Sequence, residues 1–302
     1  MKEEIFKVQS ISQLCDLCGF EKPSHPLIYI VDVSKWEIGQ DQVGLRYSSD
    51  FYTIAMKDSN CGMQYGRHYY DFNEGVMIFT APDQVTSTDK AQKLNEIQGF
   101  MIFFHRDLIR NTHLGEIIDQ YSFFSYDTHE ALHLSEKEQQ TVNGLVDNIK
   151  SEISERIDNH SNTVIVSGIE LLLNYCMRFY DRQFNTRRAQ NTDVLSTVNK
   201  CLKEYYQSNL PADQGVASVQ YLADKVHLSA HYLSDLLKKE TGRSALDHIN
   251  DFVIEKAKTN LLQSQDSISE LAYDLGFNYP HYFSRLFKQK TGISPVEYRK
   301  LN

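Results

Sequence analysis

An internal repeat in the C-terminal third constrains the fold of this chain more than any other feature. Residues 218–247 align with residues 267–297, first at an offset of 49 and, after one extra residue, at an offset of 50. The identical positions include Leu222-Ala223 with Leu271-Ala272, His231-Tyr232 with His281-Tyr282, and Thr241-Gly242 with Thr291-Gly292. Because self-similar segments adopt similar structures, the repeat predicts two copies of one supersecondary unit.

The pattern at the start of each copy predicts a helix followed by a tight turn. In the second copy, Leu271 and Leu275 fall on one helical face, and Gly276 follows where a helix would end. Asn278 is then a favourable N-cap for a second helix. In the first copy, His227 stands in place of the turn glycine, and we expect it to loosen that turn.

The second helix of the repeat and the segment between the copies also show helical spacing. Phe283, Leu286 and Phe287 lie at i, i+3 and i+4 and are predicted to face inward. Residues 252–263 carry apolar residues at 254, 257 and 261, which predicts a linking helix. A generic helical bundle with solvated polar faces would explain one such helix pair. Two copies with the same turn pattern favour two helix-turn-helix units.

The second copy resembles the AraC/XylS family of bacterial transcription regulators. The residues that carry the resemblance are Ile268-Ser-Glu-Leu-Ala, Gly276-Phe277, Tyr282-Phe283-Ser-Arg285, Phe287-Lys288, Thr291-Gly292, Ser294-Pro295 and Tyr298-Arg299. The resemblance covers residues 193–302. It implies that a linking helix holds two recognition helices roughly 34 Å apart, in successive major-groove segments of double-stranded DNA.

The resemblance also implies which side chains reach DNA. They are Pro280, His281, Tyr282, Ser284, Arg285 and Lys288 in the second copy, and Ser229, His231, Tyr232, Ser234, Asp235 and Lys238 in the first. Arg285 is the best candidate for a base contact because guanidinium pairs bidentately with guanine; a phosphate contact is its alternative.

The remaining positions divide by the contact that they imply. Ser284 and Lys288 match positions that contact the DNA backbone. Ser229, Tyr232 and Lys238 match positions that orient the first recognition helix, and His231 and Ser234 match base-facing positions. Asp235 is also base-facing. Being acidic, it either accepts a hydrogen bond from a cytosine amino group or disfavours other sequences.

The charge of the chain is unevenly distributed, which bears on DNA binding. The formal net charge is −9, but residues 193–302 hold 13 basic and 13 acidic side chains. The whole negative excess therefore lies in residues 1–192, and we expect that part not to touch nucleic acid. Recognition by a neutral domain has to depend on where individual cations point.

The N-terminal part predicts an antiparallel sheet followed by helices. β-rich runs separated by turn residues occur between residues 27 and 104, namely LIYIVDV, FYTIAM, GRHYYDF, GVMIFTAP and GFMIFF. Ser135 and Glu138 form a capping-box pattern at the start of one helix, and residues 163–180 predict another. The predicted organisation is a sensing and dimerisation domain at 1–180, a polar linker at 181–193 and a DNA-binding domain at 194–302.

This order resembles that of regulators in which a cupin-type β-barrel senses an effector and the following helices dimerise. The predicted fold class is therefore α+β, with a cupin-like antiparallel barrel and dimerisation helices before an all-α domain. A metal-binding cupin has paired histidines on one strand, whereas His68 stands alone and Gln84 occupies the later ligand position. The spacing of Ile11, Leu14, Cys15 and Cys18 is that of one apolar helix face, so this C-x-x-C favours packing over zinc binding.

The sequence as a whole predicts a DNA-binding transcription regulator that is not an enzyme, with no catalytic residue, metal or cofactor. The expected partners are promoter DNA, a second copy of the chain and a small-molecule effector, with RNA polymerase as a further candidate. With no 18-residue apolar run and no secretory signal, the expected location is the cytoplasm. The alternatives are a metal-free cupin-like binder or enzyme with a secondary DNA-binding domain, and a regulator whose N-terminal half only oligomerises.

Overall fold

The computed structural model describes residues 5–35, 37–38, 46–57, 75–87, 92–93, 99–127, 130–155, 158, 160–186 and 188–300. Contacts divide the chain into an N-terminal unit, Met1–Gln183, and a C-terminal unit, Phe184–Asn302. Over the described residues, no helix is both long enough and apolar enough to cross a membrane.

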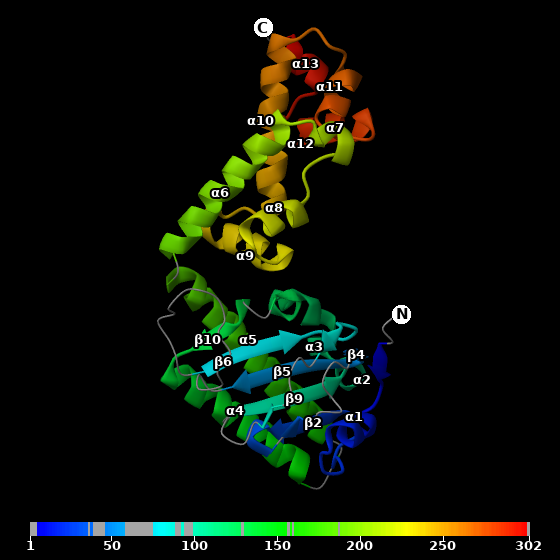
Figure 1. Ribbon diagram of the computed structural model, residues 1–302, viewed down its shortest axis with the longest axis vertical. Coiled ribbons are helices and arrows are strands. Elements are labelled where there is room, and N and C mark those ends of the chain that lie inside the picture. The colour runs from blue at the N-terminus through cyan, green and yellow to red at the C-terminus, as the bar shows by residue number, and fades with distance from the viewer. Residues whose placement is uncertain are drawn as a thin grey trace. The chain divides into compact units, whose positions relative to one another are not determined.

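A five-stranded antiparallel sheet forms the centre of the N-terminal unit (Figure 1). Its strand order is β10 (Leu132–Leu134), β6 (Gly75–Thr80), β5 (Phe51–Lys57), β9 (Gly99–His105) and β2 (Ile28–Asp32). The short strands β1 (Phe6–Val8), β4 (Arg46–Ser49) and β7 (Thr86–Ser87) form a second sheet, and β3 (Glu37–Ile38) pairs with β8 (Gln92–Lys93).

Helices cover both faces of the five-stranded sheet. Successive side chains of a strand point to opposite faces, so Phe51 and Met56 of β5 lie on different sides. The Phe51 side packs in one core with Ile11 of α1 (Ile11–Cys18). On the Met56 side, the neighbouring Met77 of β6 accepts a hydrogen bond from the buried Cys176 thiol of α5 (Ser161–Thr186), at 3.9 Å.

The predicted antiparallel sheet is present, but the predicted closed barrel is not seen in the described residues. β10 and β2 are the two edges of an open sheet. In the described residues the Phe51 face packs against Ile11 of α1 and Val8 of β1, and the other face packs against α5, so both faces have apolar partners without a closed barrel. The run GRHYYDF, with His68, lies outside the described residues, and cupin-like architecture stays a prediction.

Two long helices follow the sheet. The predicted capping box starts α4 (Glu136–Ser154), since the Ser135 hydroxyl accepts from the Glu138 N–H and the Glu138 carboxylate accepts from the Ser135 N–H. The helix predicted at 163–180 is longer than expected and ends at Thr186. The smaller helical elements among the described residues of the N-terminal unit include α2 (Arg106–Ile109), α3 (His113–Ile117) and the 3-10 turns Val33–Lys35, Ile118–Gln120 and Ser122–Ser125.

The segment predicted as a linker, 181–193, is helical except at residue 187, which the structure does not describe. Its polar residues are used within the fold. Arg182 forms an ion pair with Glu138 at 2.9 Å, and the buried Gln183 accepts a hydrogen bond from the His133 N–H at 2.8 Å. A polar, basic composition therefore reflects hydrogen bonds to buried groups in this stretch, as well as solvent exposure.

The C-terminal unit contains the predicted repeat as two helix-turn-helix copies. Its helices are α6 (Arg188–Gln207), α7 (Leu210–Gln214), α8 (Val219–Val226), α9 (Ala230–Thr241), α10 (Ala245–Gln263), α11 (Ile268–Asp274), α12 (Pro280–Thr291) and α13 (Pro295–Arg299). The first copy is α8–α9, the second copy is α11–α12, and α10 links them (Figure 1). Phe283 and Phe287 are fully buried, as the spacing predicts.

The predicted linking helix is confirmed and begins earlier than expected. A capping box between Ser244 and Asp247 starts α10 at Ala245. Its apolar positions Ile254, Ala257 and Leu261 are all buried in the core of the unit. This helix therefore gives both copies a common packing surface.

Candidate nucleic-acid interface

The turns of the two copies have the same backbone geometry. His227 has φ 57° and ψ 44°, and Gly276 has φ 90°, so both lie in the left-handed region. In each turn the next residue donates back into the first helix: Leu228 N–H to the Ala223 carbonyl at 3.0 Å, and Phe277 N–H to the Ala272 carbonyl at 2.9 Å. Histidine therefore adopts the same backbone path as glycine in this turn, and the expectation that it loosens the turn stays a prediction about stability.

Gly276 is required for a second reason besides its φ. A Cβ atom at this position would lie 2.4 Å from the carbonyl carbon of Gly215 and 2.7 Å from the amide nitrogen of Val216. The loop after α7 packs directly on the turn of the second copy. His227 is exposed, so its side chain has room at the equivalent place in the first copy.

The two recognition helices, α9 and α12, start differently. Ser229 caps α9 by accepting a hydrogen bond from the Tyr232 N–H at 3.2 Å. In α12 the N-cap residue is Tyr279, which makes no side-chain cap bond in the described structure. The prediction of Asn278 as the cap is wrong by one residue. Pro280 fits the first helical turn because its fixed φ suits a helix and it has no N–H to leave unpaired.

The predicted DNA-reading side chains of α12 lie on its exposed side. His281, Arg285 and Lys288 are exposed, and Tyr282 has 48% of its surface exposed. Pro280 and Ser284 are partly exposed. The Arg285 guanidinium lies 5.2 Å from the centre of the Tyr282 ring, a cation–π contact that orients it before any DNA is bound.

Tyr279 belongs to the same surface and was missed in the sequence. Its ring centre lies 5.6 Å from that of His281 and 5.9 Å from that of Tyr282, and 59% of the residue is exposed. A comparison of the two copies could have found it, since the offset of 50 pairs Tyr279 with Ser229.

In the first copy the predicted residues are less uniformly exposed. His231 and Lys238 are exposed, and Ser234 and Asp235 are partly exposed. Tyr232 is only 4% exposed and packs against the Phe184 ring at 5.0 Å between centres. This position suits a residue that orients α9 by packing, and leaves little side-chain surface for DNA.

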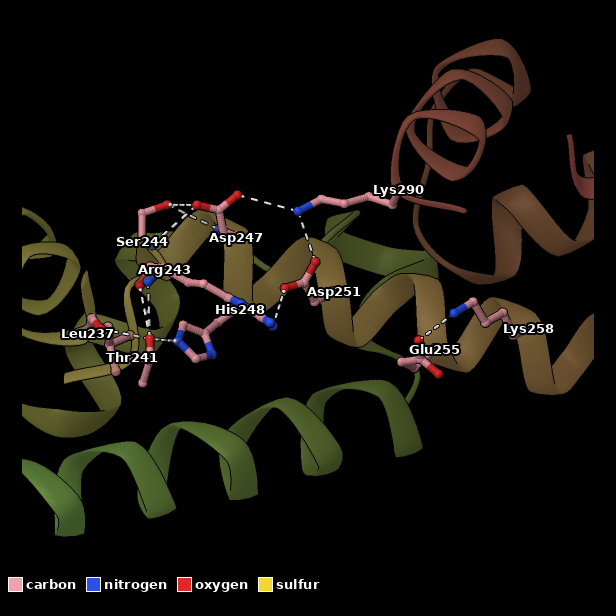
Figure 2. Close-up of polar contacts among 10 residues, drawn as sticks. All are labelled: Leu237, Thr241, Arg243, Ser244, Asp247, His248, Asp251, Glu255, Lys258 and Lys290. Carbon is pink, nitrogen blue, oxygen red and sulfur yellow. Dashed lines mark hydrogen bonds and ion pairs between the residues drawn. The ribbon is translucent and has the colours of Figure 1, made fainter. Parts of the chain in front are cut away.

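Polar side chains on the linking helix join the ends of the two recognition helices (Figure 2). Asp251 of α10 pairs with Arg243, just beyond α9, at 3.0 Å, and with Lys290, in the last turn of α12, at 2.9 Å. They line a groove of about 560 Å³ together with Asp247, Ile254, Glu255 and Lys258. The ion pair with Asp251 raises the pKa of Lys290. Sequence reasoning did not single out this network.

The structure also bears on the metal-site reasoning. In the part of the chain that the structure describes, no group of three or more His, Cys, Asp or Glu side chains could hold a metal ion. Gln84 instead donates a hydrogen bond to the Phe124 carbonyl at 2.9 Å and accepts one from the Ala81 N–H at 3.1 Å. Its side chain therefore has a structural use.

Comparisons with known proteins agree with this geometry. The family model described as "Helix-turn-helix domain" matches residues 222–301, which contain both copies apart from the start of α8. YfiF of Bacillus subtilis, named as an HTH-type transcriptional regulator, is 32% identical over 148 residues. YijO of Escherichia coli, named likewise, is 29% identical over 129 residues. The C-terminal unit therefore contains a helix-turn-helix domain.

The similarity is confined to part of each protein. The match with YfiF covers 49% of this chain and 43% of YfiF, and the match with YijO covers 43% of each. Among solved structures, the C-terminal domain of the response regulator yesN from Fusobacterium nucleatum is 30% identical, with a TM-score of 0.32; the match covers 35% of this chain and 98% of that one. The DNA-binding domain of AdpA, solved with a target DNA, is 22% identical, with a TM-score of 0.31 and coverage of 36% and 90%.

Proposed function

We propose that this chain is a sequence-specific DNA-binding transcription regulator that reads a bipartite site through α9 and α12. The observation that carries the proposal is the pair of helix-turn-helix copies on one linking helix, each with an exposed polar side on its second helix. In such a motif the second helix enters the major groove. The relatives named as transcriptional regulators support the same function.

Different side chains of α12 contact different parts of the DNA in this proposal. Arg285 reads a base, because its guanidinium is exposed and already oriented by the Tyr282 ring. Lys288 lies one turn further along the helix and contacts a phosphate. Tyr279 and His281 extend the surface at the helix start, where their rings offer apolar contact to a thymine methyl group or a sugar.

The side chains of α9 make a narrower contact. His231 and Ser234 face base edges, and Lys238 pairs with a phosphate, while Tyr232 and Ser229 hold the helix in place. Asp235 is the acidic counterpart of Arg285 in the repeat and selects a cytosine amino group or excludes other bases. The two copies therefore read different half-sites.

In vitro selection from random DNA duplexes tests this proposal. The purified full chain should enrich a sequence with two different half-sites, centred about 10 base pairs apart. The selection is run at two salt concentrations, because phosphate contacts alone give salt-dependent binding without enrichment. Retention of DNA with no enriched sequence at either concentration would contradict sequence-specific recognition.

The N-terminal unit acts in this proposal through dimerisation. Val164 and Leu171 are two turns apart on α5, and they are 50% and 47% exposed, although both are large and apolar. Among the described residues, the rings of Phe79, Phe123 and Tyr180 are in contact and buried, and they serve the core of the unit. The exposed apolar pair on α5 is the observation that supports control by dimerisation.

Sedimentation velocity tests control by dimerisation. Wild-type chain should sediment as a dimer, and V164D/L171D should sediment as a monomer with weaker binding to the selected DNA. Val296→Asp is the matched control, because Val296 is also 50% exposed but lies in the C-terminal unit. Monomeric wild type, or undiminished DNA binding by a monomeric variant, would remove dimerisation from the proposal.

A further inference from the structure

Two ion pairs converge on one carboxylate between the recognition helices. Asp251 lies in the middle of α10 and contacts Arg243 through one oxygen, at 3.0 Å, and Lys290 through the other, at 2.9 Å (Figure 2). Lys290 also reaches Asp247 at 3.4 Å. The network therefore ties three separate helical segments: the end of α9, the linking helix and the end of α12.

The position of each cation makes the network sensitive to how the helices are oriented. Arg243 follows Gly242, which ends α9 in a left-handed conformation, so it moves with the C-terminal end of that helix. Lys290 lies in the last turn of α12. A rotation of either helix about its contact with α10 would lengthen one of the two ion pairs.

The strength of each ion pair depends on how far its side chains are shielded from water. The Asp251 and Lys290 side chains are 31% and 26% exposed, so water screens their pair less than it screens a fully exposed one. Arg243 is 63% exposed, and its pair is the weaker of the two. Asp247 is further held by the Ser244 hydroxyl, which donates to it at 2.7 Å.

We propose that Asp251, by pairing with Arg243 and Lys290, fixes the orientation of α9 relative to α12 and thereby sets the half-site spacing that the chain prefers. The inference rests on the proposed bipartite DNA binding. Asp251 is a positioning residue, and it touches no DNA. Adding one base pair between the half-sites turns one of them by about 35° about the DNA axis and moves it by about 3.4 Å along that axis. Recognition helices that are free to reorient should tolerate this change better than helices whose orientation is fixed.

The same helix supplies a matched control. Glu255 lies one turn beyond Asp251 on α10 and pairs with Lys258, which belongs to the same helix, at 2.7 Å. Replacing either Asp251 by Asn or Glu255 by Gln removes one negative charge from this groove. Only the first replacement breaks a connection between different helices.

The test measures DNA affinity against spacing. The sequence enriched by wild-type chain is synthesised with its original spacing and with one base pair added or removed. For wild type the shifted duplexes should bind far more weakly than the original. For D251N the original should bind about fivefold more weakly, and the preference for it should fall about fivefold, as expected for losing about 1 kcal/mol from two coupled ion pairs.

Further variants separate positioning from general destabilisation. Lys290→Gln should reproduce the loss of spacing preference, and Lys290→Arg should retain most of it, because a guanidinium can still pair with Asp251. E255Q should keep the wild-type preference. Circular dichroism must show that each variant keeps its helical content at the temperature of the assay.

The possible outcomes distinguish this inference from the function on which it rests. Selection without an enriched sequence defeats the proposed function itself. An enriched sequence whose spacing profile is the same for wild type, D251N and E255Q overturns the role of Asp251 and leaves the function standing. Equal loss of preference in D251N and E255Q also overturns it, because charge alone would then be responsible.

Discussion

His227 in the first helix-turn-helix copy and Gly276 in the second occupy the same place in the turn and share a left-handed backbone. Their surroundings differ. The Gly276 position is in contact with the backbone of Gly215 and Val216, whereas His227 is exposed. The repeat therefore conserves a backbone path, and the neighbouring loop decides which side chain the path can carry.

The largest difference between the copies is expected for Gly276→Ala. The new Cβ would lie 2.4 Å from backbone, and alanine also has to adopt a positive φ. We expect a loss of about 3 kcal/mol in the free energy of unfolding of the C-terminal unit, from overpacking and backbone strain together. Urea unfolding followed by far-ultraviolet circular dichroism measures it.

Gly292→Ala is the matched control for that experiment. Gly292 also has a positive φ, of 85°, but a Cβ there would meet no described atom within 4 Å. Its replacement should therefore cost only the strain of the backbone, about 1 kcal/mol. Equal losses for the two variants would show that the contact with the α7 loop does not matter.

The second difference between the copies lies in recognition, where Arg285 and Asp235 occupy equivalent positions. Arg285→Ala should weaken binding to the selected DNA by about 1–3 kcal/mol and relax selectivity at one base pair in one half-site. Asp235→Ala should relax selectivity in the other half-site. Fluorescence anisotropy on duplexes with single substitutions measures both effects.

A uniform effect would assign Arg285 differently. If Arg285→Ala weakens binding equally on all duplexes and lowers the salt dependence, then Arg285 contacts phosphate. Lys288→Ala serves as the reference for that behaviour, since Lys288 is exposed on the same helix and has no ring beneath it in the described contacts. It should reduce the slope of log affinity against log salt by about 1 without changing the sequence preference.

Patterns in the sequence were sufficient to predict the repeat, the linking helix and the capping box at Ser135. The repeat shows as identities at offsets of 49 and 50, and the other two depend on spacing within a few residues along the chain. The start of α12 was misplaced because Asn278 has a high cap propensity, whereas Pro280 fits the first helical turn. The cap propensity of Asn278 was therefore outweighed by the preference of Pro280, two residues further along, for the first helical turn.

Features that depend on distant residues could not be predicted in this way. Tyr232 and Tyr282 are equivalent in the repeat, yet Tyr232 is buried because Phe184, from far upstream, packs against it. Asp251 likewise meets Arg243 and Lys290 only once α9 and α12 have packed on α10. The open sheet of the N-terminal unit is a third example, because strand alternation does not reveal which helices will cover its faces.

The turn of the first copy gives a smaller effect, of the opposite sign to that of Gly276→Ala. His227 is one of the non-glycine residues with a positive φ, which costs free energy that glycine would not lose. His227→Gly should stabilise the C-terminal unit by about 0.5 kcal/mol, the strain released less the entropy that glycine gains in the unfolded chain. His227→Ala keeps a Cβ and should give no gain; a gain of equal size would point to the ring and not to the backbone.

The smallest expected difference concerns pH. His248 on α10, just after the first copy, corresponds to Tyr298 on α13, just after the second copy, and the His248 ring nitrogen lies 2.8 Å from the Thr241 hydroxyl. Burial lowers the pKa of His248 below its usual 6.5, against the opposing effect of Asp251 and Asp247 and with a further lowering by Arg243. Thr291 donates to the Phe287 carbonyl just as Thr241 donates to the Leu237 carbonyl, but Tyr298 packs on the Phe287 ring, so Thr291 has no such titrating partner among the described residues.

A lowered pKa means that the unfolded chain takes up a proton at this histidine before the folded chain does. Neutral His248 therefore makes its full contribution to the free energy of unfolding above pH 6.5. That contribution is lost as the pH falls below 6.5 towards the pKa of His248 in the folded chain. His248→Gln keeps a polar group beside Thr241 but does not titrate, so its unfolding free energy should fall less than that of wild type between pH 7 and pH 5. His25 of the N-terminal unit also has a pKa lowered by burial, and its contribution cancels in the difference between the two proteins. Parallel pH profiles of unfolding free energy for wild type and His248→Gln would contradict this prediction. They would mean that the contact between His248 and Thr241 does not make the stability of the C-terminal unit depend on pH.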